Sequence, residues 1–237
     1  MKSDILSLLL WPLCILSIFF LFGGPASSAV DEISSCPENL HSPIQNFCEV
    51  TSEVLWRGAK PNETGVAWLI EHGVGTIVNL ELLHDDRSTV EQVTISDSGT
   101  QAVDYYRIRD WEPNVVMNQG LLDDHIAHFL AIIDQAPKPV YVHCRSGQNR
   151  TGVMVAAYRI FREGKGLDAD VIDKAIEEMG GYHGIWFNQD ADYLRGLTPE
   201  RGRLIRRKID DWKTHLTRDF HFISTFGDGP NIYSKTG

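Results

Sequence analysis

The sequence predicts an α/β fold in which a mostly parallel central sheet is flanked by helices. Short apolar segments of strand length alternate with longer segments in which apolar residues recur at helical spacing. In addition, the apolar run at 139–142 leads into a tight loop, and a helical pattern starts at Arg150. Ligands of parallel α/β sheets bind beyond the carboxyl ends of the strands, so we expect the functional site at this loop.

The first half of the expected domain supplies three strands and one helix. Asn62 is placed to cap a helix that runs from 63 to about 72 and ends at Gly73. The polar segment 84–100 predicts a loop that contains a single helical turn. The segments with the character of short strands are 53–57, 76–80 and 103–108.

The second half supplies the strand before the tight loop and most of the helices. A helix is expected after Asn118, and it ends before Pro137. The tail from Arg218 shows no regular pattern. The remaining helical patterns cover 150–162, 168–179, 190–195 and 201–216.

The first 29 residues have the character of a signal peptide. Residues 5–22 are almost continuously apolar, Lys2 precedes them, and the small residues Ser27 and Ala29 suit cleavage before Val30. This interpretation predicts export, to a bacterial periplasm. The alternative is an uncleaved anchor that holds the domain on the periplasmic side of the membrane, because the apolar run approaches the roughly 20 residues that span a bilayer.

Charge and cysteine content limit the possible partners. The formal net charge of −10 argues against nucleic acid as a partner and against broad docking onto anionic lipid. We expect a monomer with no stable membrane insertion once the signal peptide is removed. Cys36 and Cys48 are expected to form a disulfide in an oxidising compartment, the alternative being two free thiols. Cys144 then remains as a free thiol.

The segment 143–152 carries most of the functional information. The backbone N–H groups of such a strand–loop–helix turn can point inward, and the helix N-terminus adds positive potential, so a tetrahedral dianion fits there. The same surroundings favour the thiolate form of Cys144 over the thiol. Arg150 can meet two oxygens of the anion with its planar guanidinium. The segment reads His143-Cys144-Arg145-Ser146-Gly147-Gln148-Asn149-Arg150-Thr151-Gly152.

These residues match, at each fixed position, the signature His-Cys-x-x-Gly-x-x-Arg-Ser/Thr of the cysteine-dependent protein tyrosine phosphatases. The chain most closely resembles the compact, atypical dual-specificity branch of that superfamily. Two flanking segments, 54–61 and 73–80, are similar to the first strands of those enzymes, although Trp56 and Val78 depart from the usual residues. The resemblance covers roughly residues 53 to 180.

This resemblance implies the fold of a dual-specificity protein tyrosine phosphatase. Together with the pattern of the N-terminal residues, it divides the chain into four expected parts. The signal peptide occupies 1–29, and an N-terminal extension occupies 30–52. The phosphatase domain covers 53–217, and a C-terminal tail covers 218–237.

The resemblance also implies roles for the residues of the loop. Cys144 would be the nucleophile, which forms a phosphocysteine intermediate. His143 would orient the surroundings of the cysteine, and the hydroxyl of Thr151 would assist departure of the thiolate. Gly147 permits a turn that a β-carbon would obstruct. The expected phosphate-binding residues are Arg145, Ser146, Gly147, Gln148, Asn149 and Arg150. Gln148 and Asn149 either help to place the hydrolytic water or supply only backbone N–H groups.

A general acid must protonate the leaving oxygen. Asp110, which precedes Cys144 by 34 positions and stands beside Trp111 and Pro113, is the expected acid by similarity to the acid loops of related enzymes. Glu112 is its main rival. The acidic pair 123–124 lies inside a helix and is expected to form a solvated face.

The expected activity is hydrolysis of phosphate monoesters, on phosphotyrosine and also on phosphoserine or phosphothreonine, in a phosphorylated protein or a small phosphate ester. One alternative keeps the mechanism but takes inositol phosphates or phosphoinositides, because basic residues such as Arg145 often accompany those substrates in the wider family. Another alternative is a non-catalytic phosphate-binding module. The mechanism needs no cofactor and no metal, and the histidines and carboxylates have no metal-ligand spacing.

Overall fold

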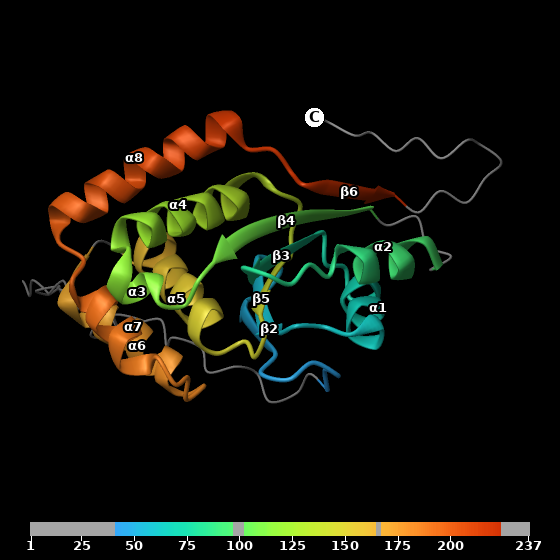
Figure 1. Cartoon of the computed structure of the whole chain (residues 1–237), viewed down its shortest axis with the longest axis horizontal. Helices are drawn as coiled ribbons and strands as arrows, with labels where there is room; N and C mark the ends of the chain where they lie inside the picture. Colours follow the sequence, from blue (N-terminus) through green and yellow to red (C-terminus); the bar gives the residue numbers. More distant parts are fainter. Residues whose placement is uncertain (1–40, 97–101, 165–166, 224–237) are drawn as a thin grey trace, which may run out of the picture. The chain divides into compact units, whose positions relative to one another are not determined.

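The parallel sheet expected from the sequence is present, and antiparallel strands border it on both edges (Figure 1). The computed structural model describes residues 41–96, 102–164 and 167–223, which all belong to one compact unit, 33–237. The strand order is β1-β2-β5-β3-β4-β6, and β2, β5, β3 and β4 run parallel. The strands are β1 Cys48–Thr51, β2 Leu55–Ala59, β3 Thr76–Glu81, β4 Ala102–Asp110, β5 Val140–Cys144 and β6 Phe220–Ile223.

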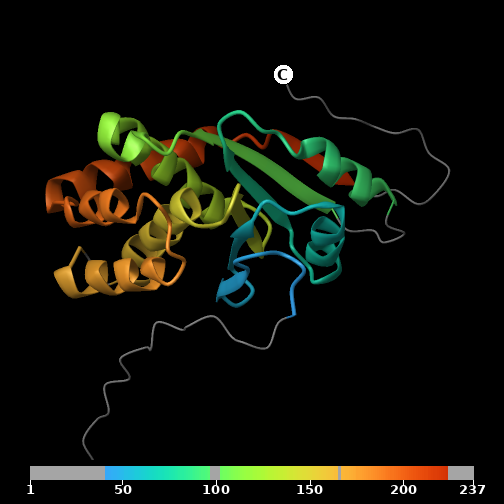
Figure 2. The ribbon, with the colours of Figure 1, turned by 60° about the horizontal axis from the view of Figure 1, so that its bottom comes forward.

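Helices cover both faces of the sheet. Figures 1 and 2 show α1 and α2 on one side and the other helices on the opposite side. The helices are α1 Glu63–Glu71, α2 Arg87–Ser96, α3 Asn114–Met117, α4 Gln119–Gln135, α5 Asn149–Tyr158, α6 Ala169–Gly180, α7 Phe187–Arg195 and α8 Pro199–His215. A π-helical turn, Arg159–Glu163, continues α5.

Successive strand residues point to opposite faces, which divides the core in two. Ile77 and Tyr141 belong to the smaller cluster, which is closed by α1 and α2. Their neighbours Val78 and Val142 belong to the larger cluster, together with residues of α4 to α8. Cys144 belongs to this larger cluster as well. The nucleophile expected from the sequence therefore lies at the strand end, on the face covered by the larger helical layer.

The helix boundaries predicted from capping residues are confirmed. The Asn62 side chain accepts a hydrogen bond from the Gly65 N–H at 2.8 Å, and α1 starts at the next residue. The Asn118 side chain accepts from the Leu121 N–H at 3.1 Å in the same way. Gly73, with a φ of +88°, lies in the left-handed conformation that ends a helix.

Three segments are more regular than their sequence predicts. The single helical turn expected within 84–100 is wrong, because α2 spans ten residues. Among the α2 side chains whose burial the structure describes, Val90 is the one apolar residue that is fully buried, too little for a clear period. The sheet starts before residue 53, since β1 pairs with β2. The sequence predicts no regular structure past Arg218, but residues 220–223 form β6 against the edge of β4. Strand pairing of this kind depends on a distant partner rather than on local pattern.

Cys48 is disulfide-bonded, whereas Cys144 is a free thiol. Cys36 and the apolar segment of the expected signal peptide lie outside the described residues, so the Cys36–Cys48 pairing remains a prediction. Within the described part of the chain, no helix is both long enough and apolar enough to cross a bilayer.

Candidate active site

The phosphate loop, Cys144–Arg150, joins the end of β5 to the start of α5. In the parallel register Cys144 stands beside Ala59 of β2, and His143 stands beside Asn79 of β3. The loop thus occupies the carboxyl edge of the sheet, with the N-terminus of α5 directed into it. Cys144 is completely buried and unpaired. A buried thiol at the base of an anion-binding loop is placed to attack a bound phosphate.

Gly147 is required at the centre of the loop for two reasons. Its φ is +73°, a conformation that side chains other than glycine rarely adopt. A β-carbon built there would lie 2.4 Å from the carbonyl carbon of Gly58 and 2.6 Å from the nitrogen of Ala59. The loop therefore packs directly against the backbone of β2, and only glycine permits this approach.

Arg150 is held at the mouth of the loop by the ends of two strands. Its Nη1 donates to the carbonyl oxygens of Leu80, at 3.3 Å, and Asp110, at 3.4 Å. Its Nε lies 3.5 Å from Oε1 of Glu112, which forms an ion pair with the guanidinium. The side chain is 13% exposed, so the cation is positioned before any anion binds. Such pre-orientation suits bidentate binding of phosphate oxygens.

The side chains at the variable positions of the loop are engaged by the protein. Gln148 donates from Nε2 to the carbonyl oxygen of Tyr182 at 2.7 Å, and Asn149 donates from Nδ2 to Asp190 at 3.3 Å. Both residues are thus placed to offer backbone N–H groups, rather than side chains, to an anion. The hydroxyl of Thr151 is buried and makes no hydrogen bond within the described residues. It is therefore free to bond a departing thiolate.

His143 has a buried partner that the sequence analysis missed. Its Nε2 lies 3.0 Å from Oδ2 of Asp86, and both side chains are almost fully buried. Burial by itself raises the pKa of Asp86, but the charge of His143 and hydrogen bonds from His143 and Tyr105 outweigh it, so the pKa of Asp86 lies well below its usual value. On its other side, Nδ1 of His143 is 3.4 Å from the carbonyl oxygen of Cys144. No local pattern pairs residues 86 and 143, because the contact depends on strand order.

The expected general acid, Asp110, lies at the site, but its carboxylate is bound by other side chains of the protein. Asp110 ends β4, and its carboxylate accepts from Asn114 at 3.2 Å and lies 2.9 Å from Nδ1 of His125. Its side chain is 3% exposed, whereas that of its rival Glu112 is 29% exposed. The carboxyl of Asp110 must therefore leave His125 before it can reach a substrate, while its backbone already contacts Arg150.

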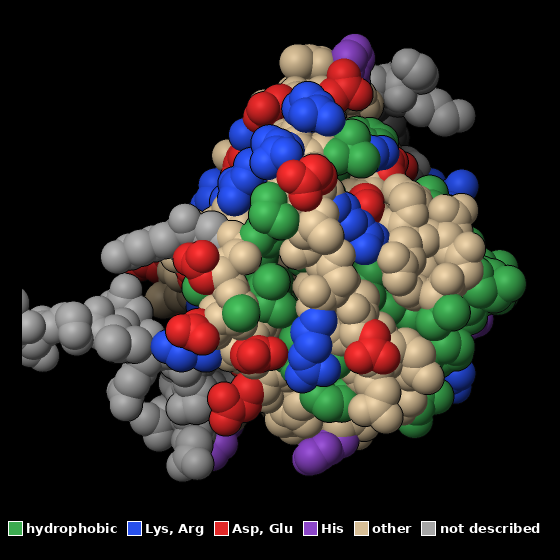
Figure 3. Space-filling view, turned by 90° about the vertical axis from the view of Figure 1, so that its left-hand side faces the viewer, with side chains coloured by type: hydrophobic (Ala, Val, Ile, Leu, Met, Phe, Trp, Pro, Cys, Tyr) green, Lys and Arg blue, Asp and Glu red, His purple; other side chains and the backbone are tan. Residues whose placement is uncertain are grey.

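The expectation of a solvated acidic face at 123–124 is wrong for Asp123. This carboxylate is buried, accepts from the Tyr193 hydroxyl at 2.6 Å and forms an ion pair with Arg201 at 2.8 Å. Asp124 is partly exposed and binds Lys208 at 2.8 Å. These pairs join α4 to α8, so two of the basic side chains of α8, Arg201 and Lys208, have a structural role. Figure 3 shows the face where α6, α7 and α8 lie, on which acidic and basic side chains are interspersed.

Asp190, which holds Asn149 of the loop, is a buried acid that the sequence analysis did not single out. It is 3% exposed, and burial raises its pKa to about 7. The hydrogen bond from Asn149 opposes this rise, while the negative charges of Glu112 and Asp110 add to it. Near neutral pH the carboxyl is therefore poised between its two forms.

Replacing Asp190 by asparagine is expected to remove a loss of stability at high pH. The folded protein keeps a proton that the unfolded chain releases near pH 3.8, so stability falls as the pH rises from about 4 to about 7. The free energy of unfolding lost over this pH range is at most about 4 kcal/mol. Urea unfolding at pH 5 and pH 8 should show that the variant gains stability relative to the parent as the pH rises. Asp192→Asn, an exposed change on the same helix, should keep the parent's pH profile; parallel profiles for Asp190→Asn would contradict the assignment.

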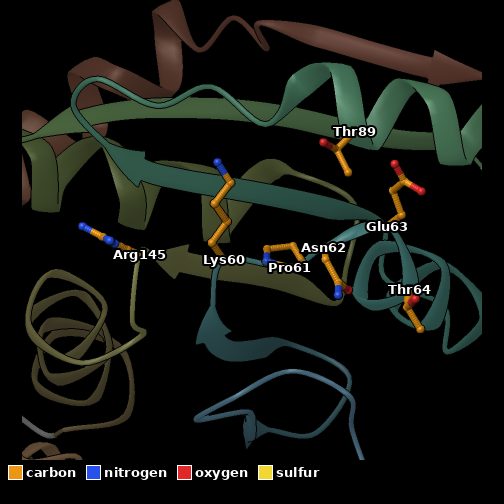
Figure 4. Close-up of a pocket in the computed structure, with 7 residues that line it drawn as sticks. All are labelled: Lys60, Pro61, Asn62, Glu63, Thr64, Thr89 and Arg145. Carbon is orange, nitrogen blue, oxygen red and sulfur yellow. The ribbon is translucent and has the colours of Figure 1, made fainter.

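A cavity of about 560 Å³ adjoins the loop at Arg145 (Figure 4). The backbone N–H of Lys60 donates to the carbonyl oxygen of Arg145 at 3.3 Å, which fixes the two basic residues beside each other. Figure 4 shows their side chains at one part of the cavity, whereas the residues of α1 and α2 lie at the other. The lining residues are Lys60, Pro61, Asn62, Glu63, Thr64, Thr89 and Arg145. Cys144 is not among the residues that line this cavity.

Known proteins resemble this chain in both sequence and fold. The family model described as "DSP-PTPase phosphatase fused to NAD+ Kinase" matches residues 38–182. The dual specificity protein phosphatase TpbA of Pseudomonas aeruginosa is 32% identical over 192 residues, which cover 78% of each chain.

Two solved structures share the fold at lower identity. A TpbA variant in complex with pTyr has a TM-score of 0.51 and 23% identity, over 73% of this chain and 99% of that one. The core catalytic domain of the PP-IP phosphatase SIW14 from S. cerevisiae, in complex with citrate, has a TM-score of 0.51 and 17% identity, over 72% and 95%. Together with the family match, the loop geometry leads to one conclusion: this chain belongs to the atypical dual-specificity branch of the cysteine-dependent protein tyrosine phosphatases and is a phosphatase.

Proposed function

We propose that the enzyme hydrolyses phosphotyrosine, and also phosphoserine or phosphothreonine, through a phosphocysteine on Cys144. The carrying observation is the buried free thiol of Cys144 at the base of the phosphate loop, with the guanidinium of Arg150 held at its mouth. The similarity to TpbA, named a dual specificity protein phosphatase, and the pTyr complex of that protein support the substrate class.

The first step transfers the phosphoryl group to sulfur. The Cys144 thiolate attacks phosphorus, the ester P–O bond breaks, and the leaving oxygen takes a proton from Asp110. Arg150 and the loop N–H groups bind the three equatorial oxygens, whose charge is redistributed in the transition state. In the second step water attacks phosphorus and gives its proton to the Asp110 carboxylate. The S–P bond breaks, inorganic phosphate leaves, and Thr151 donates a hydrogen bond to the returning thiolate.

Replacing Asp110 by asparagine is expected to lower kcat about 10²-fold or more on alkyl phosphates, because an alkoxide is a poor leaving group without a proton. The loss should be smaller on p-nitrophenyl phosphate, whose leaving group is already acidic. Rates on both substrates check this. Glu112→Gln tests the rival acid, and Asp211→Asn, an exposed change in α8, is the neutral control. If kcat fell more on alkyl phosphates than on p-nitrophenyl phosphate in Glu112→Gln, and not in Asp110→Asn, then Glu112 rather than Asp110 would be the general acid.

A substrate panel on the domain tests the function itself. The parent enzyme should release phosphate from a phosphotyrosine peptide without added metal, be inhibited by vanadate, and yield a phosphocysteine that is trapped by rapid denaturation. Tight phosphopeptide binding without phosphate release would instead indicate a non-catalytic phosphate-binding module.

A second candidate is hydrolysis of inositol phosphates or phosphoinositides. The observation that favours it is the cavity beside the loop, which is lined by the basic residues Lys60 and Arg145. The ammonium of Lys60 also forms an ion pair with Glu81, at 3.8 Å. The PP-IP phosphatase SIW14 shares the fold. Comparing phytate and phosphotyrosine peptide rates in Lys60→Met and Arg145→Met distinguishes the candidates: a loss confined to phytate favours inositol phosphates, and equal effects favour the phosphoprotein.

The signal-peptide character of residues 1–29 supports export of the enzyme to a periplasm. We propose that it acts there as a monomer, on phosphorylated proteins or small phosphate esters. The disulfide of Cys48 supports an oxidising compartment. Mass spectrometry of the mature N-terminus in the periplasmic fraction tests cleavage before Val30.

A further inference from the structure

Arg57, in the middle of β2, is a buried cation that the reaction scheme leaves unexplained. It is completely buried and is among the largest fully buried side chains. Within the described residues, no carboxylate lies in ion-pair distance of its guanidinium, and Nε and Nη1 have no hydrogen-bond partner. An isolated buried charge is costly, so a protein retains one only where a counter-charge or a function compensates it.

The hydrogen bond that Arg57 does make is to the phosphate loop. Its Nη2 donates to the carbonyl oxygen of Gly147. Because the N–H groups of the loop face the anion, this carbonyl points outward, and Arg57 contacts the outer side of the loop. Gly147 also packs on the backbone of Gly58 and Ala59, next to Arg57 in the chain. The guanidinium therefore fixes the loop residue that has the most demanding backbone geometry.

Tyr182, between α6 and α7, covers the other face of the guanidinium. The Cζ atom of Arg57 lies 3.5 Å from the centre of the Tyr182 ring, and the Tyr182 carbonyl accepts from Gln148 of the loop at 2.7 Å. The phenol is not the counter-charge, since burial raises the pKa of Tyr182 despite the opposing charge of Arg57. Glu178 is near, but its carboxylate binds Arg159 at 2.9 and 3.2 Å.

Two further groups act on Arg57, Cys144 and Tyr141. Burial raises the pKa of Tyr141 well above its usual value, so its phenol carries no charge and Cys144 is left as the candidate counter-charge. Burial lowers the pKa of Arg57, and the charges of Tyr182, Glu178 and Cys144 act to raise it. Arg57 is in register with Val142, two residues before Cys144 on the neighbouring strand. A thiolate at Cys144, and after it a bound phosphate dianion, would supply the charge that the guanidinium lacks.

We propose that Arg57 is a positioning residue that holds the phosphate loop through Gly147 and places a fixed positive charge behind it, with the Cys144 thiolate as its counter-charge. This inference rests on the proposed role of Cys144. It assigns the chain a second arginine, buried and without contact to substrate, in addition to Arg150.

The test separates charge from hydrogen bonding. Arg57→Met removes both, Arg57→Gln keeps a donor for Gly147 without the charge, and Arg57→Lys keeps the charge. The readout is the pH midpoint for alkylation of Cys144 by iodoacetamide, measured by mass spectrometry on the intact protein. We expect the midpoint to rise by about one pH unit or more in Arg57→Met and Arg57→Gln, and to stay near the parent value in Arg57→Lys. The value of kcat/KM at pH 6 should fall roughly tenfold or more in the two neutral variants.

Arg201→Met is the matched control, since Arg201 also lies over a tyrosine ring, that of Tyr193, but away from the loop. It should leave the alkylation midpoint unchanged. If Arg57→Met fails to fold, Arg57→Gln carries the test, with folding checked by circular dichroism. An unchanged midpoint in a folded neutral variant overturns the proposal and leaves Arg57 a structural role only. Alkylation needs no turnover, so failure of the proposed function, seen as no phosphate release by the parent, is a separate result.

Discussion

Cys144→Ser is expected to lower kcat by at least about 10⁴-fold, to the background rate, on every phosphate monoester. A serine hydroxyl is almost entirely protonated near neutral pH, and an alkoxide is a far worse leaving group than a thiolate, so both steps of the mechanism suffer. No neighbouring base compensates, since His143 directs Nε2 to Asp86. Phosphate release from p-nitrophenyl phosphate and from a phosphotyrosine peptide measures the loss.

The same variant should still bind substrate. The loop N–H groups and Arg150 remain in place, so calorimetry should give a Kd for a phosphotyrosine peptide close to the parent's KM where chemistry limits the rate. Unfolding curves should confirm that the buried exchange of sulfur for oxygen leaves the fold intact. Turnover clearly above background in Cys144→Ser would refute the phosphocysteine mechanism.

Arg150→Lys is expected to reduce kcat/KM by about 10³-fold. The structure holds the guanidinium by hydrogen bonds from Nη1 to the carbonyls of Leu80 and Asp110, at the strand ends beside the loop. An ammonium group keeps the charge but cannot make two parallel hydrogen bonds to phosphate. Because Arg150 binds the ground state as well as the transition state, KM should rise while kcat falls. Steady-state kinetics on an aryl phosphate separates the two effects.

The control for this prediction is Arg203→Lys, an exposed arginine of α8 paired with Glu200, which should have parent-like kinetics. Vanadate should inhibit Arg150→Lys less than the parent, since the anion loses its bidentate partner. A decrease in kcat/KM of less than about tenfold would mean that the loop N–H groups, rather than Arg150, supply most of the stabilisation.

Local sequence was sufficient for the parallel core and the phosphate loop. The positions of β3, β4 and β5, and the caps Asn62 and Asn118, follow from apolar runs and from side chains that bond their own neighbours. The phosphate loop could also be predicted, because its conformation depends on the contiguous residues from His143 to Thr151. Gly147 illustrates this: its positive φ belongs to the turn itself.

What the amino-acid pattern could not convey is how distant residues meet around that loop. Arg57 reaches Gly147, His143 meets Asp86, and Asp190 holds Asn149 only because the strand order and the packing of α7 bring them together. The strand β6 and the buried Asp123 were missed for the same reason. The pKa of a charged group and the free-energy cost of burying it depend on how deeply it is buried and on which groups it contacts. Both are fixed by tertiary packing, so they cannot be read from residues adjacent in the sequence.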